Sequence, residues 1–128
     1  MVLSGFNDRP QLLSGTALVR ARMCESLATA LGAADGGAYF LTGLMSVLDA
    51  MLALPMPDAL RQLPLGQDIA AALQQRTGRL GAVLACVIAW ERGEWDAAAI
   101  DGLAPERLQV AYLEALQWAE HTRAMLGD

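Results

Sequence analysis

The side chains that could perform chemistry in this 128-residue sequence are few and lie far apart. His121 is the one histidine. A metal site needs two or more neighbouring ligands, and a catalytic triad needs a placed nucleophile and acid, so a lone histidine suggests neither. We expect His121 to be a surface residue.

Two charged residues, Arg20 and Asp49, fall beside apolar surface when the sequence is read with helical periodicity. A charge on the core side of a helix needs a partner. We therefore expect Arg20 and Asp49 to satisfy each other or nearby backbone groups. A phosphate-binding role for Arg20 and Arg22 is the alternative, although no glycine-rich phosphate loop accompanies them.

Two tryptophans, Trp90 and Trp95, bracket a glycine break at Gly93. If exposed, the rings would make a contact hot spot or a stacking platform. The simpler interpretation is that they cap the end of a core helix.

The two cysteines, Cys24 and Cys86, lie far apart within apolar helical patterns. This spacing is typical of buried thiols in a reducing compartment rather than of a disulfide or a metal site. The N-terminus lacks the pattern of a signal peptide, so we expect a cytoplasmic protein.

The charge pattern argues against nucleic-acid binding. The formal net charge is -5, and the nine basic residues are all arginines that form no run. Such a pattern lacks the basic stripe that neutralises phosphate backbones. A membrane span is also not expected, because the most apolar stretch, residues 39–54, is short and contains Asp49.

Residues 39–54 form the stretch around which we expect the chain to pack. Two apolar stripes run along it at helical spacing: Phe40, Leu44, Val47 and Met51, and beside them Leu41, Met45, Leu48 and Leu52. The remaining stripe is small or polar, so another helix could approach closely there; it consists of Thr42, Ser46, Asp49 and Ala53, with Gly43 and Ala50 beside it. A second apolar helix at residues 78–92 is its expected partner.

The other predicted helices follow from cap residues, prolines and glycines. The first should begin with Asp8 as cap and Pro10 in its first turn, and end near Leu31. Further helices are expected at residues 57–62, 67–75, 94–100 and from Pro105 to about residue 126. In the last helix the residues expected to face inward are Leu108, Tyr112, Ala115, Ala119, Thr122 and Leu126. No segment alternates as a strand would. The prediction is one all-α domain over residues 1–128, with five to seven helices.

The order of several short motifs resembles the C-terminal portion of HDOD domains, and more narrowly the HDOD region that follows an EAL domain in bacterial proteins of cyclic di-GMP signalling. The motifs are residues 20–28, 38–52, Leu63-Pro-Leu65, Arg79-Leu-Gly81, Trp90-Glu-Arg-Gly-Glu-Trp95 and residues 112–119. The resemblance extends from about Leu12 to Leu126 and implies an HD-like helical bundle. It also implies that the first helices of such a domain, and any EAL domain, lie outside this chain.

The resemblance places the metal-binding His-Asp pair of active HD phosphohydrolases at Ser46 and Val47. A serine hydroxyl is a poor ligand and valine has no donor atom, so a hydrolytic metal pair cannot be assembled there. We therefore expect no enzyme activity, no metal and no cofactor.

The function expected from these patterns is a non-catalytic signalling module that contacts a protein partner or an adjacent EAL domain. The alternative is a degenerate HD-like fold that binds a nucleotide through Arg20 or Arg22 and stacks it on Trp90 or Trp95, provided that these residues share one cleft. A metal-dependent phosphohydrolase is the least favoured. We also expect a homodimer, with Val2, Leu3 and Phe6 at one edge of the apolar surface that pairs.

Overall fold

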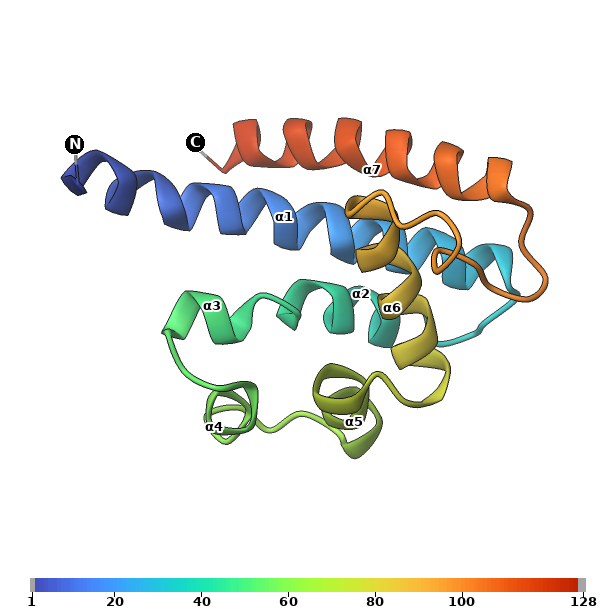
Figure 1. Ribbon diagram of the computed structural model, residues 1–128, viewed down its shortest axis with the longest axis horizontal. Coiled ribbons are helices and arrows are strands. Elements are labelled where there is room, and N and C mark those ends of the chain that lie inside the picture. Colours follow the sequence, from blue (N-terminus) through green and yellow to red (C-terminus); the bar gives the residue numbers. More distant parts are fainter. Residues whose placement is uncertain (1, 127–128) are drawn as a thin grey trace.

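The computed structural model describes residues 2–126, with side chains described from Leu13 onward. This part of the chain is helical and contains no strand, which confirms the all-α prediction. The helices, in chain order, are α1 (Val2–Ala30), α2 (Gly36–Met45), α3 (Leu48–Leu52), α4 (Met56–Leu60), α5 (Gln67–Gln75), α6 (Gly78–Glu91) and α7 (Pro105–Met125) (Figure 1). No helix among the described residues is long and apolar enough to cross a membrane.

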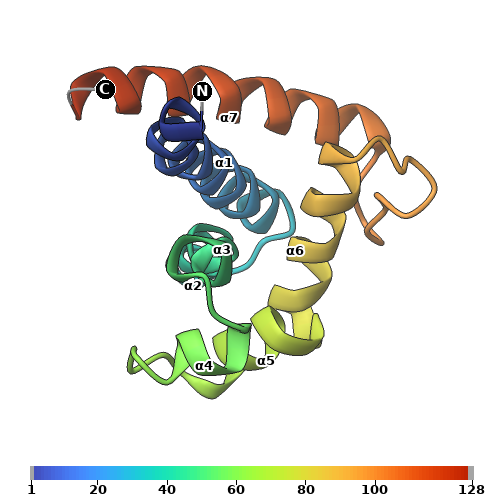
Figure 2. The same ribbon diagram turned by 60° about the vertical axis from the view of Figure 1, so that its left-hand side comes forward.

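The helix at the centre of the packing is α1. Figures 1 and 2 show α7 on one side of α1, α2 and α3 on the opposite side, and α6 crossing beside them. The buried cluster draws on α1, α2 and α4 to α7, and its largest fully buried side chains include Met23, Leu27, Leu84 and Leu108. Because α1 is the longest helix and touches both outer layers, it organises the fold in place of the predicted segment 39–54.

The small stripe of the segment 39–54 is where α2 meets α1. A Cβ added to Gly43 would lie 2.5 Å from the backbone oxygen of Arg20, so the two helices approach more closely than any larger residue permits. Thr42 and Ser46 are buried on the same face. The predicted close approach is confirmed, but the main partner of α2 is α1 and not α6.

The predicted single helix over residues 39–54 is wrong, because it divides into α2 and α3 at Ser46 and Val47. The Ser46 hydroxyl donates a 2.7 Å hydrogen bond to the Gly43 carbonyl, and the Ser46 amide bonds the same oxygen at 3.3 Å. A serine that bonds its own helix backbone competes with the regular i to i−4 pattern, and this helix breaks there. Of the two apolar stripes only Val47 is fully buried, while Met51 and Leu52 are exposed.

The remaining boundaries agree with the sequence in most places. α5 covers the predicted residues 67–75, α4 has Pro57 in its first turn, and Gly32 ends α1 with a φ of 78°. Two expectations fail. α1 begins at Val2 and continues through Pro10, which cannot donate a helical hydrogen bond, and residues 94–100 form turns in place of a helix.

The inward face of α7 is as predicted over most of its length. Leu108, Ala115 and Ala119 are buried, and Tyr112 and Thr122 are half-buried. Leu126 is 71% exposed, because α7 ends at Met125 and the next residue lies past the last turn. Glu106, Glu114 and Glu120 are exposed as expected.

Candidate functional site

A cluster of three polar side chains, Arg20, Ser46 and Glu91, joins α1, the break between α2 and α3, and the end of α6. We call it the Arg20 cluster. Arg20 Nε donates to both Glu91 oxygens at 3.1 Å, and Nη2 lies 3.0 Å from Glu91 Oε1. Arg20 Nη1 donates to Ser46 Oγ at 3.1 Å. The Arg20 and Glu91 side chains are only 17% and 20% exposed, so the pair is largely removed from water.

The backbone explains how the Arg20 cluster is positioned. Gly43 holds α2 against α1 at the level of Arg20, and Ser46 follows three residues later at the end of α2. Because Ser46 also donates to the Gly43 carbonyl, its hydroxyl oxygen is fixed as an acceptor for the guanidinium. The local helix break therefore creates the polar contact.

The predicted pairing of Arg20 with Asp49 is wrong. Arg20 is paired with Glu91, and Asp49 Oδ1 accepts a 2.8 Å hydrogen bond from the Ala50 amide in the first turn of α3. Asp49 is therefore bonded to a backbone group, which is the second of the two alternatives that the sequence left open. Division of the helix at Ser46 and Val47 changes which residues share a face, and this is why the periodicity misplaced Asp49.

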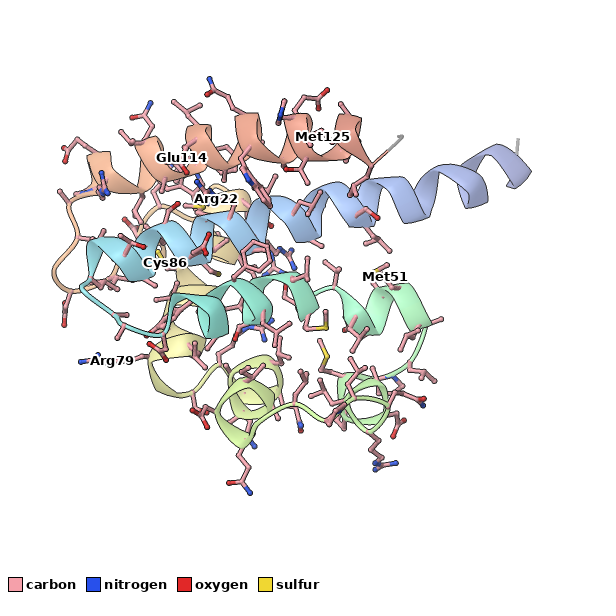
Figure 3. All side chains as sticks on the ribbon, turned by 180° about the vertical axis from the view of Figure 1, so that it is seen from behind. Arg22, Met51, Arg79, Cys86, Glu114 and Met125 are labelled. Atoms are coloured by element: carbon pink, nitrogen blue, oxygen red, sulfur yellow. The ribbon has the colours of Figure 1, made fainter. Side chains whose placement is uncertain are left out.

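Arg22 lies on a different side of α1 and links it to α7. Its Nη1 lies 3.1 Å from Glu25, its Nε lies 3.1 Å from Glu114, and its guanidinium lies 5.5 Å from the centre of the Trp118 ring. Figure 3 shows Arg22 on α1 beneath Glu114 of α7. Charge pairing and stacking on an aromatic face are typical structural roles for arginine.

The two tryptophans are in contact with each other. The ring centroids of Trp90 and Trp95 lie 4.8 Å apart in an edge arrangement, and Trp90 also lies 6.2 Å from Tyr112. Trp95 is 62% exposed and lines a hollow of about 390 Å³ between the end of α6 and the start of α7. Neither Arg20 nor Arg22 lines this hollow, so the structure does not bring the four proposed nucleotide contacts together there.

Both cysteines are buried free thiols, as predicted. Burial, and to a lesser extent the nearby Glu91 carboxylate, raise the pKa of Cys24 to about 12, although the Arg20 guanidinium acts in the opposite direction. Burial likewise raises the pKa of Cys86 to about 11. Thiols with such pKa values remain protonated at neutral pH and are poor nucleophiles. His121 is exposed, as expected.

Among the described residues, no group of three or more His, Cys, Asp or Glu side chains is placed to hold a metal ion. Ser46 and Val47, where the HDOD resemblance implies the His-Asp pair, are both buried. The Ser46 hydroxyl is bonded to the Arg20 guanidinium, which places a permanent positive charge beside this position.

The sequence patterns did not predict two features of the site. Glu91 lies within the motif Trp90-Glu-Arg-Gly-Glu-Trp95, and nothing in that motif indicates its pairing with Arg20. A hollow of about 450 Å³ lies between the α1–α2 connection, α2, α6 and the segment before α7, with Tyr39, Arg79 and Asp101 among its lining residues. Its walls come from distant parts of the chain, so local spacing gives no signal for it.

Comparison with known proteins gives two similar chains. One is the cyclic di-GMP phosphodiesterase CdgJ of Vibrio cholerae serotype O1, which is 30% identical over 125 residues that cover 94% of this chain and 29% of CdgJ. The other is the uncharacterized protein YuxH of Bacillus subtilis, which is 30% identical over 106 residues that cover 81% of this chain and 26% of YuxH. The chain therefore spans less than a third of the length of either relative.

No family model matches the chain, and no solved structure matches it. The similarity to CdgJ agrees with the cyclic di-GMP context of the resemblance. The HDOD assignment itself stays a prediction.

Proposed function

We propose that this chain is a non-catalytic regulatory domain of bacterial cyclic di-GMP signalling that works through contact with a protein partner, such as an adjacent EAL domain. The Arg20 cluster is the observation on which the proposal rests. The HDOD resemblance puts Ser46 at the position of a metal-binding histidine, and in the cluster the Ser46 hydroxyl is bonded to the Arg20 guanidinium.

Electrostatics support a structural role for this cluster. The guanidinium of Arg20 carries a positive charge, so it would repel a divalent cation placed beside Ser46. Glu91, a carboxylate that could otherwise bind such a cation, is already bonded to Arg20 through both of its oxygens. The polar groups of the cluster thus satisfy one another and hold three elements together.

The similarity to CdgJ supports the signalling context. CdgJ carries the name of a cyclic di-GMP phosphodiesterase, and the part of it that matches this chain is 29% of its length. We infer that the shared part regulates or positions a reaction performed elsewhere, in keeping with the absence of imidazole ligands other than His121.

The test is a contact and activity experiment with an EAL phosphodiesterase encoded in the same genome. We expect the purified chain to crosslink to that enzyme and to change its rate of cyclic di-GMP hydrolysis in a saturable way. An unrelated helical protein of similar net charge, added at the same concentration, is the control. Absence of both crosslinking and a rate change at saturating concentration would remove the regulatory role.

A further inference from the structure

An apolar groove lies along α1 on the side that faces away from α6. Figure 2 shows α7 above α1, α2 and α3 below it and α6 beside it, while no described helix covers the opposite side. The groove has a volume of about 270 Å³, and its lining residues are Ser14, Ala17, Leu18, Leu44, Met45, Leu48, Met51 and Leu126. None of them is charged.

Small side chains form the bottom of the groove, and exposed apolar side chains form its sides. Ser14 and Ala17 on α1 are small, so another helix could lie close to α1 there. Met51 is 50% exposed and Leu126 is 71% exposed, and they line the groove from α3 and from the end of α7. Figure 3 shows Met51 in the space between α3 and α1. Hollow and protruding apolar side chains therefore occur in one patch.

We propose that this groove is the interface of a two-fold homodimer, in which Met51 and Leu126 of each copy pack against the groove of the other. A two-fold interface pairs the same patch on both copies, so the patch must contain both a hollow and something to fill it. The groove meets this condition. The inference is independent of the proposed function.

Charge favours a second copy over a charged partner. The chain has a formal net charge of -5, which would oppose self-association at most surfaces. The groove is a neutral patch, so two copies can meet there without placing like charges in direct contact. A partner selected by charge would find no charged group among the residues that line the groove.

The apolar area fits a weak dimer. Taking roughly 100 Å² of apolar area for a leucine-sized side chain, the exposed parts of the groove residues and of neighbouring Leu52 and Leu54 amount to roughly 300 Å² per copy. Weak complexes bury less than about 1,200 Å² in total, of which a little over half is apolar. The exposed apolar area of the two copies together makes up most of the apolar area that a weak interface buries. We therefore expect a dissociation constant in the micromolar range.

The sequence predicts a dimer with Val2, Leu3 and Phe6 at one edge of the paired surface. The side chains of these three residues are not among those that the structure describes. Figure 1 shows the first turns of α1 extending past α3 and past the end of α7, at the same end of the molecule as the groove. The proposed interface is therefore centred on the groove, whose α1 lining begins at Ser14.

The test is sedimentation velocity of the full chain from about 1 to about 200 µM, a range suited to a micromolar dissociation constant. We expect the mass to rise from 13.6 kDa towards twice that value. Met51→Glu should weaken the dimer at least about tenfold, since it places two like charges in the interface. The matched control is Leu113→Glu, because Leu113 is 51% exposed on α7 and does not line the groove.

Circular dichroism shows whether each variant is folded. If Met51→Glu does not fold, Leu126→Glu decides the question, because Leu126 follows the last helix and is not part of the core. A monomer at every concentration would overturn the proposal and leave the groove to another partner. Equal weakening by Leu113→Glu and by the groove variant would also overturn it.

Discussion

Replacing Arg20 by methionine tests the structural role of the Arg20 cluster. Methionine keeps an unbranched apolar stem against α2, while the Glu91 carboxylate and the Ser46 hydroxyl lose their partner. A hydrogen bond to a charged group contributes about 1.5–3 kcal/mol, and breaking a fully buried ion pair costs about 3–5 kcal/mol. Since Arg20 and Glu91 are 17% and 20% exposed, water partly solvates the remaining charge. We expect the free energy of unfolding to fall by about 2–4 kcal/mol.

The assay is urea unfolding followed by circular dichroism at pH 7. The matched control is Arg61→Met, because Arg61 pairs with Asp58 at 3.0 Å with side chains that are 78% and 44% exposed. An exposed pair contributes at most about 1 kcal/mol. If Arg20→Met lowers the free energy of unfolding no more than Arg61→Met does, the Arg20 cluster does not hold the fold together.

A double-mutant cycle isolates the pair itself. Glu91→Gln removes the negative charge, so the double variant no longer has an unpaired buried carboxylate. We expect the double variant to lose less stability than the sum of the single losses, with a coupling of about 1–3 kcal/mol. Additive losses would mean that the pairing of Arg20 with Glu91 does not stabilise the protein.

Three further predictions follow from the packing and from the burial of the two thiols. Gly43→Ala should lower the free energy of unfolding by about 1–3 kcal/mol despite alanine's better helix propensity, because its Cβ would lie 2.5 Å from the Arg20 carbonyl oxygen. The control is Gly37→Ala in the same helix. A Cβ added at Gly37 meets no atom within 4 Å, so this variant should be neutral or slightly stabilising. Comparison of the two unfolding curves checks this, and equal effects would contradict it. The raised pKa values of Cys24 and Cys86 predict that iodoacetamide alkylates neither thiol in the folded protein at pH 8, and mass spectrometry after brief labelling would detect a violation. Because these thiols ionise more easily when unfolded, their contribution to the free energy of unfolding should be complete below about pH 9.0. It should then fall as the pH rises to about 11 for Cys86 and to about 12 for Cys24, which urea unfolding at increasing pH would measure.

Local pattern predicted the helices well where each is bounded by its own signals. Proline in a first turn and glycine after a last turn act over a few residues, so α4, α5 and the end of α1 could be located from the sequence. The segment 94–100 shows the limit of this reasoning. It has alanines and an apolar face, but Trp95 packs against Trp90, and the chain forms turns there.

The sequence predicted only part of the candidate site. Periodicity placed Arg20 on a buried face and so required a partner, but Glu91 is 71 residues away and nothing local connects them. The break at Ser46 depends on a hydroxyl that bonds the Gly43 carbonyl, and the apolar residues around it gave a continuous helical pattern. Long-range pairing and local backbone competition are the two kinds of information that a periodicity argument lacks.

The most direct test of the non-catalytic assignment measures bound metal and phosphodiester turnover on the same purified sample. The chain would be supplied with iron, manganese or magnesium, desalted, analysed for metal content, and then incubated with cyclic di-GMP and a generic phosphodiester. With Arg20 bonded to Ser46 and Glu91, we predict no stoichiometric metal and no turnover above the buffer rate. Stoichiometric metal together with turnover, both lost in a variant of the metal's ligands, would contradict the account.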